Sequence, residues 1–209
     1  MPKQVAIKDI IDAVLEGYTE AQIIYEKMSG GDWLWQAPEY FITATVAYKI
    51  NDLPGRKYLT LEYGSAITID EAGARGRGRL PKDIREKGKV DILLWWAKGV
   101  PRAIIEIKNQ IYSREQYEKD IKRIKSFLKR NSHESSLQFG IFAFYESAFT
   151  GSRKTAKEKV EDKINNIYKD AKYILGDIFE TKIFTTSTQD EYDRDLWKAA
   201  SILIKLKST

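Results

Sequence analysis

Hydrophobic residues recur at helical spacing in the first part of the chain, at Ile7, Ile10, Ile11, Val14, Leu15 and Tyr18. Gly17 interrupts this pattern, and Thr19 with Gln22 matches a capping box, so we expect two short helices joined near Gly17. Their outline is similar to that of a helix-turn-helix that reads DNA. We favour the alternative, in which this element packs on the rest of the fold through Trp33 and Trp35.

Three later stretches also have a helical period, and they cover 38–50, 113–130 and the residues from Ser152 or Thr155 up to Gly176. The stretch 113–130 is amphipathic, whereas 38–50 is apolar around much of its circumference. Pro38 suits the first turn of a helix, and Ser113 with Gln116 forms a capping box. The polar face of 113–130 is dense in Lys and Arg. We interpret that face as a solvated surface rather than as a DNA track.

Short apolar runs bounded by turn residues predict the strands. Two runs lie within 89–110, on either side of the sequence AKGVP, and further strands are expected at 57–69, 137–145, 178–186 and 200–207. The stretch 57–69 fits a strand pair or one bent strand. The last two stretches alternate between apolar and polar positions, and we expect them to be additions at a sheet edge.

The stretch 89–110 places three charged residues inside its two very apolar runs. The connection between the runs has the length of a hairpin turn, so the runs predict adjacent antiparallel strands. Because side chains alternate along a strand, Asp91 shares a face with Leu93, and Glu106 shares a face with Lys108. The start of the first strand lies beside the end of the second, and we therefore expect Asp91 near Glu106 and Lys108.

Two carboxylates and an ammonium at the end of a buried hairpin are costly to desolvate unless a partner balances their charge. A divalent cation would do so, since Mg²⁺ takes one or two protein carboxylates and keeps several waters. Lys108 beside such a site could hold a metal-bound water or neutralise charge on a phosphate. The predicted chemistry is hydrolysis of a phosphodiester bond with Mg²⁺, for which Mn²⁺ can substitute.

Asp91, followed at the end of the next strand by Glu106, Ile107 and Lys108, resembles the active site of the PD-(D/E)XK nucleases, the restriction-endonuclease-like superfamily. Val90 stands where that motif has its proline. The resemblance implies that Asp91, Glu106 and the main-chain carbonyl of Ile107 hold the metal. It also implies that Lys108 positions the attacking water.

The tripeptide Glu-x-Lys occurs three times, at 106–108, 161–163 and 180–182, so the tripeptide alone carries little information. Only the first copy ends an apolar run, follows a strand with an acidic residue and precedes a predicted helix. The alternative interpretation of that copy is a solvated strand end whose charges form a surface salt bridge.

The resemblance implies an α/β fold with a mixed central sheet flanked by helices, in the order helix, three-stranded antiparallel meander, helix, strand. The last strand should run parallel to the strand of Glu106. We expect a helical element at 1–36, packed on the core, and a nuclease-like domain at 37–209 with C-terminal additions. Many members carry an acidic residue on the first core helix, for which Glu39 is the candidate; Glu39 could instead only stabilise the positive end of its own helix.

The composition excludes several kinds of site. There is no cysteine, hence no disulfide framework and no cysteine-based zinc site, and the single histidine, His133, lies in a polar connection. No stretch approaches 18 uninterrupted apolar residues, and Asp9 and Asp12 interrupt the apolar start of the chain. We therefore expect a soluble, cytoplasmic protein without a membrane partner.

The net charge of +5 is concentrated in residues 75–89, which contain seven Arg or Lys against Asp83 and Glu86. The rest of the chain therefore sums to zero. Such an excess favours a polyanionic partner. The residues that we expect to contact nucleic acid are Arg75, Arg77, Arg79 and Lys82. The alternative is a solvated charged loop.

These features predict a metal-dependent deoxyribonuclease, an endonuclease of the restriction, defence, repair or recombination type. DNA is the expected partner, and RNA is the alternative. Two other functions stay open. The first is a catalytically silent nuclease-fold protein that binds DNA or acts as a scaffold. The second is an unrelated nucleic-acid-binding module that uses the basic loop within residues 75–89. Cutting both strands of a duplex often takes two active sites, so a homodimer is a further expectation.

Overall fold

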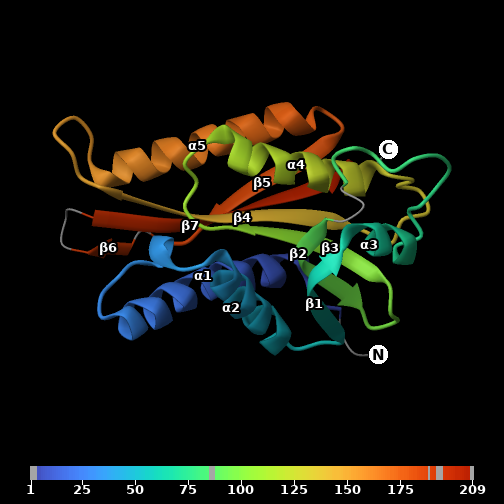
Figure 1. The fold of residues 1–209 in the computed structure, drawn as a ribbon, viewed down its shortest axis with the longest axis horizontal. Helices are drawn as coiled ribbons and strands as arrows, with labels where there is room; N and C mark the ends of the chain where they lie inside the picture. Colours follow the sequence, from blue (N-terminus) through green and yellow to red (C-terminus); the bar gives the residue numbers. More distant parts are fainter. Residues whose placement is uncertain (1–3, 85–87, 188, 192–194, 208–209) are drawn as a thin grey trace.

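A mixed β-sheet is the centre of the fold in the computed structural model (Figure 1). The structure describes residues 4–84, 88–187, 189–191 and 195–207. In these ranges the strands follow the order β1-β2-β3-β4-β7-β5, and the short β6 pairs with β7. The strands are β1 (Lys57–Gly64), β2 (Lys89–Trp96), β3 (Pro101–Lys108), β4 (Phe139–Phe149), β5 (Phe179–Thr185), β6 (Gln189–Glu191) and β7 (Asp195–Leu206).

Helices cover both faces of the sheet, with α1 and α2 on one side and α4 and α5 on the other (Figure 1). The helices are α1 (Ile7–Ser29), α2 (Glu39–Asp52), α3 (Ser65–Glu71), α4 (Arg114–Lys129) and α5 (Ala156–Leu175), with a 3-10 turn at Leu34–Gln36. Alternation along β2 divides the core accordingly: Ile92 and Leu94 pack with α1 and α2, whereas Leu93 and Trp95 pack with α4 and α5. None of the helices in the described ranges has the length and apolar composition that crossing a membrane requires.

The predicted order of helix, antiparallel meander, helix and strand is confirmed by α2, β1, β2, β3, α4 and β4. β1 pairs antiparallel with β2, and β2 pairs antiparallel with β3. β4 returns parallel to β3, as the helical crossover through α4 allows. The mixed sheet flanked by helices is therefore confirmed, with α3 inserted between β1 and β2.

α1 is one continuous helix, so the prediction of two helices joined near Gly17 is wrong. A Cβ atom at Gly17 would lie 2.6 Å from the Cα of Val46 in α2. Gly17 therefore permits close packing of two helices instead of ending one, and the helix-turn-helix outline is wrong with it. Trp33 stacks on Phe149 with ring centroids 5.8 Å apart, whereas Trp35 is partly exposed.

Two strand predictions also need correction. The stretch 57–69 is neither a strand pair nor a bent strand, because β1 ends at Gly64 and the next residues form α3. The last strand was expected at a sheet edge, but β7 lies between β4 and β5 and begins at Asp195. The middle of β7 is buried on both faces, as an inner strand covered by helices requires. β5 does lie at the edge of the sheet.

Candidate active site

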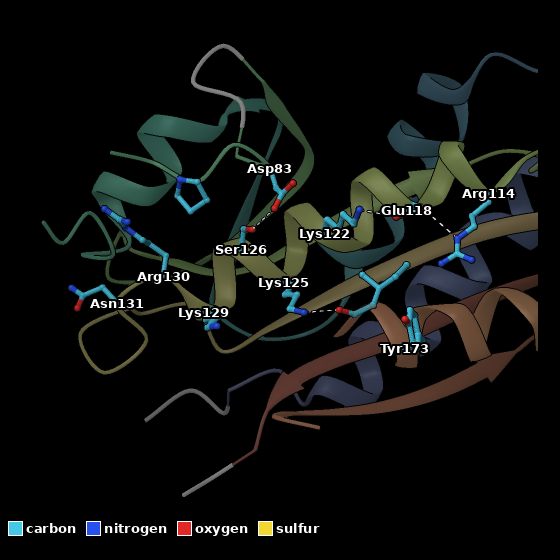
Figure 2. Close-up of a pocket in the computed structure, with 12 residues that line it drawn as sticks. Asp83, Arg114, Glu118, Lys122, Lys125, Ser126, Lys129, Arg130, Asn131 and Tyr173 are labelled. Atoms are coloured by element: carbon cyan, nitrogen blue, oxygen red, sulfur yellow. Dashed lines mark hydrogen bonds and ion pairs between the residues drawn. The ribbon is translucent and has the colours of Figure 1, made fainter. Parts of the chain in front are cut away.

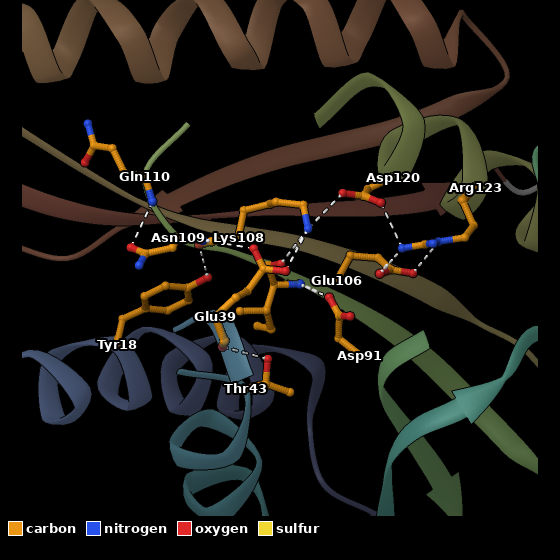
Figure 3. Close-up of polar contacts among 11 residues, drawn as sticks. Tyr18, Glu39, Thr43, Asp91, Glu106, Lys108, Asn109, Gln110, Asp120 and Arg123 are labelled. Atoms are coloured by element: carbon orange, nitrogen blue, oxygen red, sulfur yellow. Dashed lines mark hydrogen bonds and ion pairs between the residues drawn. The ribbon is translucent and has the colours of Figure 1, made fainter. Parts of the chain in front are cut away.

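Strands β2 and β3 bring the predicted acidic residues to the same end of the sheet (Figure 3). Ile92 pairs with Ile105, and the same register places Asp91 opposite Glu106. The Ile107 main-chain N–H donates a hydrogen bond to Asp91 Oδ2 at 2.7 Å. By alternation, Asp91 and Glu106 lie on the face of the sheet that α4 covers. The structure therefore brings together two carboxylates that are 15 positions apart in the sequence.

Lys108 is the centre of a polar network at the end of β3. Its Nζ donates to Glu39 Oε1 at 2.9 Å and to the main-chain oxygen of Ile107 at 3.3 Å, and lies 3.3 Å from Asp120 Oδ2. Burial lowers the pKa of Lys108, but the carboxylates of Asp120 and Glu39 outweigh this effect and raise the pKa above its ordinary value. Lys108 is therefore an ammonium at neutral pH. It can orient a water molecule or balance phosphate charge, but it cannot act as a general base.

Glu106 is completely buried and is bound by Arg123 of α4 (Figure 3). Arg123 Nε donates to Glu106 Oε1 at 2.8 Å, and Arg123 Nη2 donates to Oε2. Burial, and then the charge of Asp91, raise the pKa of Glu106 well above its ordinary value, and Arg123 opposes this rise. Two-point arginine–carboxylate pairs are among the strong polar contacts in proteins. Arg123 thus provides the positive charge that the burial of Glu106 requires.

Asp120 and Arg123 join the network from α4, and no role was predicted for either residue. Asp120 Oδ1 accepts a hydrogen bond from Arg123 Nη2 at 2.8 Å. Asp120 Oδ2 is buried and accepts no hydrogen bond from the described residues, although it faces the Lys108 ammonium. One signal was present in the sequence: Asp120 falls inside the apolar stripe of Tyr117 and Ile121, where a charged residue needs a buried partner.

Glu39 is the first residue of α2, and its carboxylate points toward Lys108 (Figure 3). Glu39 Oε2 also accepts a hydrogen bond from the Asn109 main-chain N–H at 3.4 Å. The Asn109 side chain donates to the carbonyl oxygens of Leu34 and Ala37, at 2.9 and 2.8 Å, and so ties the start of α2 to the end of β3. Glu39 therefore contacts the network directly instead of only stabilising its own helix. Its side chain is 41% exposed, so the network reaches solvent here.

The arginines predicted to contact nucleic acid belong to a loop that wraps around Arg130. The Arg130 guanidinium donates to the main-chain oxygens of Arg75, Arg77 and Arg79, at 2.6, 3.0 and 3.3 Å. These contacts fold the loop onto the end of α4, and none of the three arginines joins the network around Lys108. Residues 85–87 of the same basic stretch lie outside the described ranges.

A pocket of about 470 Å³ opens over the network and gives solvent access to Lys108. Its lining includes Lys82, Lys108, Lys119, Asp120, Lys122 and Arg123. Lys82 is therefore the predicted nucleic-acid contact that the structure places beside the candidate site. A phosphate that entered this pocket would meet several cations before it reached the buried carboxylates.

The expected metal donors fit Mg²⁺ in kind. Asp91, Glu106 and the Ile107 carbonyl provide hard oxygens, and Mg²⁺ takes one or two carboxylates with waters at the other positions. Burial raises the pKa of Asp91 in spite of the Ile107 N–H bond and the nearby Lys108, so this carboxylate lacks its full counter-charge. In the part of the chain that the structure describes, no group of three or more His, Cys, Asp or Glu side chains is arranged to hold a metal. Glu106 could coordinate a metal ion together with Asp91 only if its ion pair with Arg123 were broken.

Comparison of the chain with protein-family profiles, curated proteins and solved structures gives no match. The roles of Asp91, Glu106 and Lys108 therefore follow from their own geometry and chemistry. Their arrangement has a specific chemical property: an ammonium is held between acidic side chains at the open end of a site whose inner carboxylates are buried.

Proposed function

We propose that the protein is a metal-dependent deoxyribonuclease with a restriction-endonuclease-like fold, which hydrolyses phosphodiester bonds with Mg²⁺ or Mn²⁺. The observation that carries this proposal is the convergence of Asp91, Glu106 and Lys108 at one end of the β2–β3 hairpin. The order of α2, the meander, α4 and β4 supports the fold assignment. The partly buried Asp91 carboxylate, whose pKa burial raises in spite of the nearby Lys108, supports the need for a cation.

Each residue has a distinct role in this proposal. Asp91, Glu106 and the Ile107 carbonyl would hold the metal ion, which when bound stabilises charge on a phosphoryl oxygen and makes water a better nucleophile. Lys108 donates hydrogen bonds to the attacking water or to the scissile phosphate. It does not remove the proton, because its acidic neighbours keep it protonated. Glu39 holds the Lys108 side chain in place through the 2.9 Å contact.

A catalytically silent protein of the same fold, which binds DNA or acts as a scaffold, is the second candidate. One observation favours it: both oxygens of Glu106 are bound by Arg123. If that pair persisted in the presence of a divalent cation, Glu106 could not serve as a ligand.

Incubation of the purified protein with supercoiled plasmid and with circular single-stranded DNA separates the two candidates. Cleavage that needs Mg²⁺ or Mn²⁺ and stops in EDTA is the result that the nuclease proposal predicts. Salt-sensitive DNA binding without cleavage of either substrate, under both metals, would support the silent protein instead. The Glu106→Gln variant shows whether any cleavage arises from this site.

A further inference from the structure

We infer that an unpaired DNA strand binds along α4, in a basic groove that runs from the candidate active site to an exposed tyrosine on α5. This inference rests on the proposed nuclease function, because it names the form of DNA that reaches the site. It also replaces the interpretation of the lysine-rich face of α4 as a plain solvated surface.

The groove is continuous with the candidate site. A hollow of about 1040 Å³ lies along α4, and Figure 2 shows Lys125, Lys129 and Arg130 at the same hollow as Tyr173. This hollow shares Lys122 and Asp83 with the smaller pocket over Lys108. The two hollows therefore form one path that leads to the buried carboxylates.

The path carries a strong positive charge. Its lining contains nine Lys or Arg against four Asp or Glu, an excess of +5 that equals the formal net charge of the whole chain. Lys119 and Lys129 are exposed, and within the described ranges neither side chain forms an ion pair or a hydrogen bond. They lie ten positions apart on α4, or about 15 Å along the helix axis. Both ammonium groups are thus free to bind phosphates at separate points on the path.

An aromatic platform stands at the far end of the path. Tyr173 of α5 is 83% exposed, the largest exposed fraction among the large hydrophobic side chains that the structure describes. Lys125 donates a hydrogen bond to the Ile174 carbonyl oxygen at 2.5 Å and so fixes the spacing of α4 and α5 beside that ring. Single-stranded nucleic acid is typically bound by a basic groove together with aromatic rings on which bases stack.

The dimensions suit one strand. The 16 residues of α4 span about 24 Å, the length of about seven nucleotides at ~3.4 Å each. A hollow near 1000 Å³ is at the upper limit for enclosing a small ligand, so it accommodates a few nucleotides at once. A duplex would contact this hollow with one backbone only, and its paired bases could not lie on Tyr173.

The test is fluorescence anisotropy with a labelled 12-nucleotide single strand and the matching duplex, in EDTA and over a range of salt. We expect the single strand to bind more tightly than the duplex. The Lys119→Glu/Lys129→Glu variant should bind the strand at least tenfold more weakly. Because this variant no longer neutralises two of the phosphates, the slope of log affinity against log salt should become shallower by about 1.4. Lys27→Glu/Lys98→Glu makes the same charge change at exposed positions outside the groove and should bind normally.

Stacking is tested separately at the tyrosine. Tyr173→Ala should weaken strand binding about tenfold, whereas Tyr173→Phe, which keeps the ring, should bind as the unmodified protein does. The inference is overturned if the duplex binds as tightly as the single strand, if both double variants weaken binding equally, or if Tyr173→Ala has no effect. These outcomes are independent of catalysis, because EDTA prevents cleavage. A protein that binds the strand as expected but cleaves no DNA with any metal would contradict the nuclease proposal and leave the groove intact.

Discussion

The Arg123 guanidinium and the Glu106 carboxylate form a two-point ion pair that joins α4 to the end of β3. The side chain of Glu106 is 0% exposed and that of Arg123 is 13% exposed, so water screens the pair little. Asp120 contacts Arg123 at 2.8 Å, and Lys108 lies 3.3 Å from Asp120. The buried carboxylates of Glu106 and Asp120 therefore depend on two cations, Lys108 of β3 and Arg123 of α4.

Arg123→Met should destabilise the protein, because it leaves Glu106 buried without its counter-charge. We expect the free energy of unfolding in urea at pH 7 to fall by about 3 kcal/mol. The double variant Arg123→Met/Glu106→Gln should recover much of this loss, since residue 106 then carries no charge and Asp120 keeps Lys108 as its cation. Arg114→Met, on the exposed part of the same helix, should cost under ~1 kcal/mol. Equal stability of the Arg123 and Arg114 variants would show that the buried pair is not needed for stability.

Lys108→Ala should lose DNA cleavage without losing the fold. Removal of one preorganised donor to a reacting group typically lowers the rate by about 100-fold or more. Initial cleavage rates with Mg²⁺ measure the effect, and circular dichroism and thermal unfolding check the fold. Lys98→Ala, at an exposed position before β3, is the matched control and should cleave normally. Full activity of Lys108→Ala would remove this lysine from the mechanism.

Glu146, in the last part of β4, should make stability depend on pH. Burial raises its pKa to about 8, against the opposing effects of Lys163 and of the hydrogen bond from the Ile111 N–H. A carboxyl group with a raised folded-state pKa binds more protons in the native state than in the unfolded state. The free energy of unfolding should therefore fall as the pH rises from about 4.5 to about 8, by on the order of 5 kcal/mol, and then level off.

Urea unfolding at pH 5.5 and pH 8.5 measures this dependence, and Glu146→Gln is the comparison. The glutamine cannot ionise, so the difference between the two pH values should become smaller by most of that amount. An unchanged difference would mean that another group causes the pH dependence.

Gly17→Ala should destabilise the protein, although the same change at an unhindered helix position stabilises by up to about 1 kcal/mol. The added Cβ would lie 2.6 Å from the Val46 Cα, so α1 and α2 would have to separate. We expect a loss of about 1–3 kcal/mol in urea unfolding. Val46→Ala in the same background should restore little, because the nearest atom belongs to the main chain. A stabilised Gly17→Ala variant would show that the helices have room to adjust.

The alternation of apolar residues was sufficient to predict much of the candidate site. It correctly placed Asp91 near Glu106 at the end of the β2–β3 hairpin, and the order of α2, the meander, α4 and β4, although not α3, followed from local patterns. Both properties depend on the period of the backbone, which neighbouring residues determine. Contacts between a helix and a strand that are distant in the sequence cannot be predicted in this way. The ion pair between Glu106 and Arg123 depends on how α4 packs, and no local pattern encodes that packing.

The wrong predictions also concern features that depend on tertiary packing instead of on neighbouring residues. The sequence of α3, Ser65 to Glu71, contains Ile67, Thr68 and Ile69, which favour strands when taken locally, and only the tertiary context makes it a helix. In the sequence alone Gly17 predicts the end of a helix, and only its close contact with Val46 of α2 explains why a glycine is needed there. The position of β7 inside the sheet depends on its partners and not on its own alternation.

The most direct test of the proposed function is cleavage of supercoiled plasmid and circular single-stranded DNA by the unmodified protein and by Asp91→Asn, with Mg²⁺, with Mn²⁺ and in EDTA. Asp177→Asn, an equal change at an exposed position outside the network, is the control. We predict metal-dependent cleavage by the unmodified protein and by Asp177→Asn, and none by Asp91→Asn. Equal cleavage by all three proteins, or none by the unmodified protein with either metal, would contradict a nuclease site at Asp91, Glu106 and Lys108.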